Sequence, residues 1–551
     1  MNYKDQISQH YSEILDGTYE CVDRIVINGY YRAGYIPGGF RNFWRTLKGT
    51  DENLDKNHLM RMVGRFSRRI QAYTKKEGIP FIHCKPRERK HELAEQYIPQ
   101  EKDFEGIFLI LVSLSTGHIW EVVRASESGK IRNLKPKKPY PFVNHYWFHI
   151  MDKEWGHMTI KMCGHPPFGT QIILNGHEWV EREALRNDFS IIKEGNCFTS
   201  FENSEDLCNI ADTLFKRGHL QKVCDRWIYR CLWFGLNQEE QERTGFFYQY
   251  SLCQGELSRN FLFRSGAELD EIYQNIIDLT RRHLDVKKLA TIFGYKRRPR
   301  RNGKRKRASL QVRIEKPKYN MTVFKILDGK MTVKMYDKGE RVLRIEVVYH
   351  NLRDMRCKRG LDNFEVIIKQ FRKVLESFIS VLYFSHVSFI DKGEFEQLSE
   401  QSKKGKNRLA GINLDKARCR NVMKAVLGLC TKSRGFTTKD VANKYTQITK
   451  ISDQTYTPRH AAYDLRKLEA KGLVYRKKNC RKYQLTAKGI SMIVATTTIR
   501  EKIFKPIVAG IRKKKISPPP QNLSKVDQAY IAIRDKIMDI CDHYGVVGVI
   551  M

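Results

Sequence analysis

Residues 148–162 read FHIMDKEWGHMTIKM, and residues 324–335 read FKILDGKMTVKM. If the first copy carries a three-residue insertion, every position is identical or a close substitution. In both copies apolar and polar side chains alternate on either side of a turn that contains Asp and Gly, which is the pattern of a β-hairpin. We therefore predict that the middle of the chain contains the same hairpin twice.

Each predicted hairpin continues into a third strand-like run, at residues 169–174 and 342–349, and then into a helical stretch. This order predicts a small antiparallel sheet backed by helices, present in two copies, and therefore a duplicated α+β core. Helices would cover one face of each sheet. The other face would carry Lys161 and Lys334, and it would suit a phosphate backbone.

The region 416–489 carries a different pattern, in which helical runs precede a basic hairpin. A helix is expected over 437–445, and a further one begins at the N-cap Thr457 with Pro458 as its first residue and ends at Gly472. The expected inner stripe of that helix is Ala461, Ala462, Leu465 and Leu468. The candidate nucleic-acid-binding side chains outside the stripe are Arg459, His460, Tyr463, Arg466 and Lys467.

The hairpin expected at 473–485 forms a basic wing with Lys477, Lys478 and Arg481. Helices followed by a basic hairpin occur in this order in the winged helix-turn-helix fold. Residues 416–489, with the run DLRKLEAKGLVYR, resemble the DNA-binding domains of bacterial winged-helix regulators. The resemblance implies that the last helix enters a major groove of DNA and that the wing contacts phosphates. RNA binding and protein contact are the alternatives.

The charge balance points to a polyanionic partner. Among 551 residues, Lys and Arg number 100 against 61 Asp and Glu, which gives a net charge of +39. Such an excess favours nucleic acid, because cations that neutralise phosphates release counterions. A helix over 59–75 adds Arg65, Arg68 and Arg69. A basic linker at 295–309 adds Lys296, Arg297, Arg298, Arg300, Arg301, Lys304, Arg305, Lys306 and Arg307.

Other features of the sequence favour a cytoplasmic protein without a membrane partner. No apolar run approaches the ~20 residues of a membrane span, and the first residues lack the apolar core of a signal peptide. The 13 cysteines include no CxxC pair, which is typical of reduced thiols. No phosphate-binding Gly-rich loop, GxGxxG, HExxH or GxSxG pattern occurs, so no nucleotide or organic cofactor is expected.

The run KMYDKGERVLRIEV at residues 334–347 resembles the YDK…RxE stretch of rolling-circle replication initiators of the plasmid trans-acting type. The resemblance implies that Glu346 holds Mg²⁺ or Mn²⁺, that Arg344 contacts a phosphate and that Tyr336 or Tyr349 is the nucleophile. Arg344 and Glu346 share a strand face, whereas Tyr349 points to the other face unless a bulge intervenes. The alternative is a structural hairpin with alternating polar residues.

Histidines gather between residues 145 and 177, with Cys163 and Glu178 nearby. Because no pair has a standard zinc spacing, we expect these histidines to be buried or to face phosphate.

Several longer stretches, among them HLMRMVGRFSRRIQAY and ILNGHEWVEREA, resemble a family of uncharacterised bacterial proteins with a C-terminal winged helix. The expected units are an N-terminal α/β domain (1–134), two sheet-plus-helix modules (142–294 and 310–398) joined by the basic linker, a winged helix-turn-helix with its following helix (412–512) and a C-terminal helix (521–551). The function expected is that of a mobile-element or replication protein that binds DNA and nicks it with a metal. The alternatives are a ribonucleoprotein component and a non-catalytic regulator.

Overall fold

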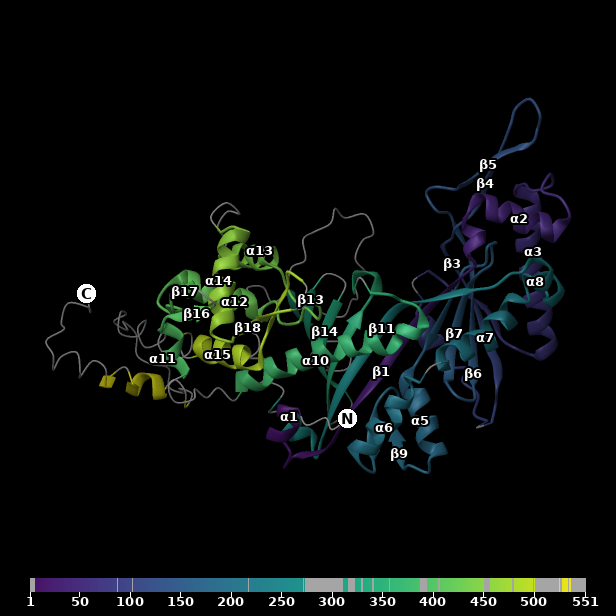
Figure 1. Ribbon diagram of the computed structural model, residues 1–551. Coiled ribbons are helices and arrows are strands. Elements are labelled where there is room, and N and C mark those ends of the chain that lie inside the picture. Colours follow the sequence, from purple (N-terminus) through teal and green to yellow (C-terminus); the bar gives the residue numbers. More distant parts are fainter. Residues whose placement is uncertain are drawn as a thin grey trace, which may run out of the picture.

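The computed structural model in Figure 1 describes most of the chain and shows an α+β protein. The described residues are 5–86, 88–101, 103–216, 218–270, 272, 311–315, 323–328, 331–338, 341–355, 357–386, 394–404, 407–449, 456–477, 480–498, 500, 525, 528–533 and 535–536. The predicted basic linker at 295–309 lies outside them, as does most of the predicted C-terminal helix.

One eleven-stranded sheet runs through the centre of the molecule. Its longest strands, β1 (Leu15–Tyr30) and β11 (Gln249–Phe263), pair antiparallel over nearly their whole length. The strand order is β12-β13-β14-β15-β11-β1-β8-β7-β6-β3-β2. The remaining strands of this sheet are β2 (Phe81–His83), β3 (Gly106–Thr116), β6 (Phe142–Asp152), β7 (Gly156–Cys163), β8 (Thr170–Leu174), β12 (Gln311–Glu315), β13 (Val323–Asp328), β14 (Met331–Lys338) and β15 (Val342–Tyr349).

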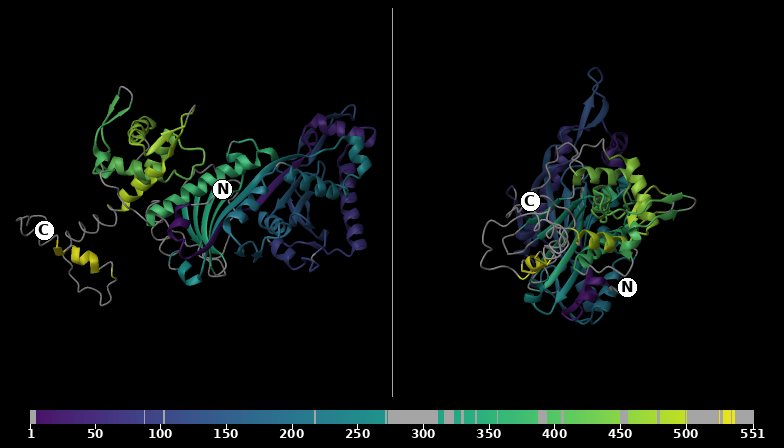
Figure 2. Two further views of the ribbon diagram at one scale, coloured as in Figure 1. Left: turned by 60° about the horizontal axis from the view of Figure 1, so that its bottom comes forward. Right: turned by 90° about the vertical axis from the view of Figure 1, so that its left-hand side faces the viewer.

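The two halves of this sheet have the same strand order on either side of the β1–β11 pair. Reading outward, the first half is β1-β8-β7-β6-β3 and the second is β11-β15-β14-β13-β12. The two predicted hairpins are β6–β7 and β13–β14. Because β1 and β3 precede residue 134 and β11 precedes residue 294, the sheet runs through both of the unit boundaries expected there. Figure 2 shows the long central strands joining the halves.

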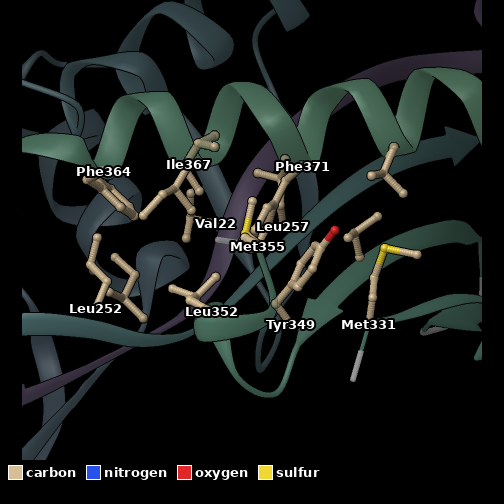
Figure 3. Close-up of a cluster of buried hydrophobic side chains, with 14 of the residues drawn as sticks. Val22, Leu252, Leu257, Met331, Tyr349, Leu352, Met355, Phe364, Ile367 and Phe371 are labelled. Atoms are coloured by element: carbon tan, nitrogen blue, oxygen red, sulfur yellow. The ribbon is translucent and has the colours of Figure 1, made fainter. Parts of the chain in front are cut away.

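A helical layer covers one face of the sheet. Over the second half, Phe364, Ile367 and Phe371 of α10 face Leu257 and Tyr349 of the sheet (Figure 3). The helices of the described residues are α1 (Gln6–His10), α2 (Pro37–Lys48), α3 (Lys56–Glu77), α4 (Lys90–Glu95), α5 (Gly176–Arg186), α6 (Ser204–Thr213), α7 (His219–Leu232), α8 (Gln238–Thr244), α10 (Phe364–His386), α11 (Glu394–Ser399), α12 (Ala417–Leu427), α13 (Thr438–Thr449), α14 (Pro458–Ala470) and α15 (Ala487–Thr498). Of these, the short α4 packs on the opposite face, where Ala94 clusters with Leu111 and Trp147.

Over the first half, the face that carries Lys161 is only half buried. Along β7, His157, Thr159 and Lys161 are half-exposed and alternate with fully buried apolar side chains. The buried set packs on the helical side, where the ring of Phe148 stacks on that of Phe234 at 5.7 Å. The first half therefore has one helix-covered face and one that is partly open.

The same face is closed over the second half by the small hairpin of β9 (Ile191–Lys193) and β10 (Phe198–Phe201). Arg341 donates to the carbonyl of Thr199 at 2.8 Å, and the Phe198 amide donates to the hydroxyl of Tyr19 on β1 at 2.9 Å. With α10 on the other face, every residue of β15 is buried.

A C-terminal unit of residues 412–498 lies at one end of the molecule, beside α10 (Figure 1). It contains α12, α13, α14 and a hairpin of β18 (Val474–Arg476) and β19 (Tyr483–Leu485), in the order expected from the sequence. Phe436 bridges to Tyr483 and adds a third short strand segment. In the part of the chain that the structure describes, no helix is long and apolar enough to cross a bilayer.

Candidate active site and nucleic-acid interface

Tyr336, Glu346 and Lys334 meet on the face of the second half that lies away from α10. The register places Lys334 opposite Glu346 and Tyr336 opposite Arg344 on the neighbouring strand. The Tyr336 hydroxyl donates to Glu346 Oε2 at 2.7 Å, and Lys334 Nζ donates to Oε1 at 2.6 Å. Two of the residues named by the initiator resemblance are therefore directly hydrogen-bonded.

The electrostatics of this pair oppose free ionisation of the tyrosine. Burial and the neighbouring Glu346 carboxylate both hold the pKa of Tyr336 well above its usual value. Burial is the largest influence on Glu346 and disfavours its charged form, but the Lys334 ammonium together with the hydrogen bonds from Lys334 and Tyr336 lowers the pKa of Glu346 overall. Glu346 is thus a carboxylate at neutral pH, placed to accept the proton of Tyr336.

Arg344 is an internal residue, although the sequence suggested a phosphate contact. Its side chain is 1% exposed. The guanidinium donates to Asn260 Oδ1 at 2.6 Å and to the Asn196 carbonyl at 2.6 Å. It also lies 3.3 Å from Asp23 Oδ1 and 3.4 Å from His177 Nε2. With its donors directed at the protein, Arg344 positions the neighbouring strands.

Asp23 and His177 complete this buried group. Burial opposes the charge on Asp23, but Arg344 and then His177 counter it, and the pKa of Asp23 lies far below its usual value. Burial lowers the pKa of His177 to about 4. The group therefore consists of a carboxylate held by a guanidinium and a neutral imidazole at neutral pH.

Glu256 on β11 is a further carboxyl of this face, and its pKa predicts a pH dependence. Burial, then the charge of Glu346, raise the pKa of Glu256 to about 7. A carboxyl with a raised folded-state pKa stabilises the fold below pH ~4.5 and loses that contribution as the pH rises through ~7. Glu256→Gln is therefore expected to be more stable than the parent at pH 8, by up to ~3 kcal/mol, and equally stable at pH 4.5.

Urea unfolding at both pH values measures this difference, with the exposed Glu127→Gln as the control. Equal stabilities of Glu256→Gln and the parent at pH 8 would contradict the raised pKa.

Tyr349, the other candidate nucleophile, lies on the helical side of the sheet (Figure 3). Its ring stacks on Phe371 of α10 at 4.8 Å, and the residue is 7% exposed. It follows Glu346 by three positions in a regular strand, so the two side chains point to opposite faces. Tyr349 is not brought together with Glu346, and Tyr336 alone of the two tyrosines contacts it.

The residues around Glu346 do not fit a metal ion as they stand. Both carboxylate oxygens already have a partner, one from Lys334 and one from Tyr336. Within the described ranges, no three His, Cys, Asp or Glu side chains are grouped so that they could hold a metal. In the histidine cluster, two of the imidazoles contact each other. His149 Nδ1 lies 3.0 Å from His157 Nε2, and burial lowers the pKa of both histidines.

The outer surface of α14 is the most exposed basic surface among the predicted binding residues. Arg459, His460, Tyr463 and Arg466 are exposed and Lys467 is half-buried with its ammonium over the Tyr463 ring. Ala461, Leu465 and Leu468 form the buried stripe, while Ala462 is half-buried. The acid within this stretch, Asp464, points inward and accepts from Arg418 at 3.0 Å.

The predicted wing is also basic in the structure. Arg481 is exposed, Lys477 is half-buried, and Lys478 lies outside the described residues. Burial, then the nearby cation Lys373 of α10, lower the pKa of Lys477. Lys477 of the wing therefore lies near Lys373 where the wing approaches α10.

The arginines of α3 are divided between packing and exposure. Arg65 pairs with Glu240 at 2.6 Å and Arg69 lies over the Trp233 ring at 5.3 Å, so both bind within the protein. Arg68 is exposed. The nine basic residues of the linker, from Lys296 to Arg307, lie outside the described residues.

Sequence reasoning missed Asp23, Asn196 and Glu256. It expected His177, as one of the clustered histidines, to be buried or to face phosphate, and His177 is buried, but its contact with Arg344 was not foreseen. Arg344 and Asp23 are separated by 321 residues in the sequence. They meet because β1, which carries Asp23, and β15, which carries Arg344, both pair with β11. The sequence around Asp23, CVDRIVI, is that of an ordinary strand and contains no motif that would predict a role for Asp23.

No protein-family model, curated protein or solved structure matches the chain.

Proposed function

We propose that this chain is a nucleic-acid-binding protein whose C-terminal unit acts as a winged helix on duplex DNA. The observation that carries the proposal is the surface of α14, where Arg459, Tyr463 and Arg466 are exposed and the acid of the same stretch is buried. A helix with this surface suits the major groove, which is ~12 Å wide and admits an α-helix. The net charge of +39 supplies the long-range attraction.

Replacing Arg459 and Arg466 together by alanine is expected to weaken duplex DNA binding about 100-fold, since each base-reading arginine contributes ~1–3 kcal/mol. The measurement is fluorescence anisotropy at several salt concentrations with a DNA selected by the parent protein. The control is Lys153→Ala, an exposed cation on the β6–β7 turn. If the double variant and the control bind duplex DNA as tightly as the parent, α14 is not the DNA-reading helix.

A second candidate function is strand nicking at Tyr336, favoured by its hydrogen bond to Glu346. In this reaction a bond forms between the tyrosine oxygen and phosphorus, and the phosphorus–oxygen bond to one deoxyribose breaks. The tyrosine proton passes to Glu346, and the released sugar oxygen takes up a proton from solvent water. Because the pKa of Tyr336 is raised, the proton must leave as the new bond forms. Activity of this kind fits a mobile-element or replication protein.

RNA remains the alternative polyanion, and a regulator without catalysis is the alternative role. Sequencing the nucleic acid that copurifies with the protein distinguishes RNA binding from DNA binding. We propose a cytoplasmic location, which the free state of the twelve described cysteines supports.

A further inference from the structure

The two halves of the sheet carry different chemistry at equivalent positions. Lys161 on β7 and Lys334 on β14 correspond in the repeat, and each pairs with the third strand of its half. Lys334 faces Glu346, whereas Lys161 faces the neutral Gln171. Two positions beyond Lys334 is Tyr336, and two beyond Lys161 is a cysteine. The first half therefore keeps the cation and lacks both the carboxylate and the tyrosine.

The first half instead has a row of side chains suited to binding. The register aligns Trp147, Lys161, Gln171 and Asn28 across four neighbouring strands, and all four are half-exposed. Gln171 Nε2 donates to Asn28 Oδ1 at 2.9 Å. This row, which we call the tryptophan row, lies on the partly open face of the sheet, and α4 packs beside its Trp147 end.

The indole at the end of the row is fixed and flanked by cations. Trp147 Nε1 donates to the hydroxyl of Ser113 at 2.9 Å, which holds the ring in place. The ammonium groups of Lys161 and Lys90 lie over the ring, 5.1 Å and 5.2 Å from its centroid. When an ammonium moves off the ring, the fixed indole provides a face for a base, and the lysines provide cations for the adjoining phosphates.

We propose that the tryptophan row is a non-reacting subsite for single-stranded nucleic acid. One unpaired base stacks on Trp147 in the place of a lysine ammonium, and Lys90 and Lys161 move from the ring to the flanking phosphates. The Gln171 and Asn28 amides meet the edge of a neighbouring base. A duplex does not expose its bases for stacking, so the subsite selects single strands. This inference rests on the proposed nucleic-acid binding, and it adds a second surface remote from α14.

The test compares Trp147→Leu with Trp233→Leu. Trp233 is 47% exposed and also lies under a cation, Arg69, but at the C-terminal end of α7 in the helical layer. The probes are fluorescein-labelled oligothymidylate, oligouridylate and a DNA duplex. Trp147→Leu is expected to weaken binding of a single strand about tenfold and to leave duplex binding unchanged, since a stacked base contributes ~1–3 kcal/mol. Lys161→Gln should weaken the same probe by a smaller factor and reduce its salt dependence.

The failure of this subsite is distinguishable from the failure of DNA binding through α14. The Arg459→Ala/Arg466→Ala variant should lose duplex binding and retain the single-strand affinity of the parent. Single-strand affinity unchanged by both Trp147→Leu and Lys161→Gln would overturn the proposal, as would an equal loss in Trp233→Leu. Loss for only one of the two single-stranded probes would support the subsite and identify the sugar it prefers. If Trp147→Leu does not fold, as judged by circular dichroism, Lys161→Gln decides alone.

Discussion

Phenylalanine in place of Tyr336 is expected to abolish strand cleavage, with a loss of at least about 10³-fold. The substitution removes one oxygen, the atom that would attack phosphorus, and leaves the ring in its strand. Supercoiled DNA incubated with Mg²⁺ or Mn²⁺ and resolved on a gel measures nicking. A protein–DNA adduct that survives denaturation, formed by the parent and absent from Tyr336→Phe, identifies the tyrosine as the nucleophile.

Tyr349→Phe is the matched control, because it removes the same atom from the other candidate tyrosine on the helical side of the sheet. It should nick DNA like the parent. Glu346→Gln should also lose nicking, since an amide cannot accept the Tyr336 proton. Nicking by Tyr336→Phe equal to that of the parent would remove this assignment, and absence of nicking from the parent protein would favour a binding protein without catalysis.

The hairpins could be predicted because their information is local. In each copy the two strands and the turn lie within fifteen residues, and alternation of apolar and polar side chains specifies which face is buried. The third strand follows directly in both halves, so it too could be predicted. The structure confirms the α+β class, and the shared strand order of the halves is consistent with the predicted duplication, although the two expected small sheets form one sheet.

The joining of the halves into one sheet could not be predicted. It depends on the pairing of β1 with β11. In this pairing Tyr19 lies opposite Asn260, although most of the N-terminal half of the sequence separates the two residues. Nothing in the sequence of either strand specifies the strand with which it pairs. Both strands are long and largely buried, so their composition fits a separate domain as well as it fits the centre of a common sheet.

The candidate site likewise contains residues that a local motif could predict and residues that only long-range pairing brings in. Tyr336, Glu346 and Lys334 come from adjacent strands of one local meander, and a short motif could suggest them. The role of Arg344 could not be read in this way, because its partners Asp23 and His177 arrive through long-range pairing and through the start of α5. Strand periodicity correctly placed Arg344 beside Glu346, but burial beneath the 191–201 hairpin turned an expected phosphate contact into an internal one.

Arg344 joins parts of the chain that belong to both halves of the sheet. It lies on β15, donates a hydrogen bond to Asn260 Oδ1 on β11, and contacts Asp23 on β1. On the opposite face, Glu20 of β1 accepts from Arg259 of β11 at 2.9 Å and is bound by Arg372 of α10. The central strand pair is therefore held by a buried ion group on each face.

Arg344→Ala is expected to destabilise the protein by ~3–5 kcal/mol, because it leaves the Asp23 carboxylate buried without its cation. Urea unfolding at pH 7 measures the change. Arg344→Lys should recover only part of the loss, since an ammonium cannot reach Asn260, Asn196 and Asp23 together.

The double variant Asp23→Asn/Arg344→Met provides the decisive comparison, because it removes both charges. If Arg344 stabilises mainly by compensating Asp23, the double variant should be more stable than the single variant Arg344→Met. Additive losses from Asp23→Asn and Arg344→Met would instead mean that the two side chains stabilise the fold independently. In that case the bonds to Asn260 and Asn196 would account for the stabilisation by Arg344, and the halves would be joined by hydrogen bonding and strand pairing on this face.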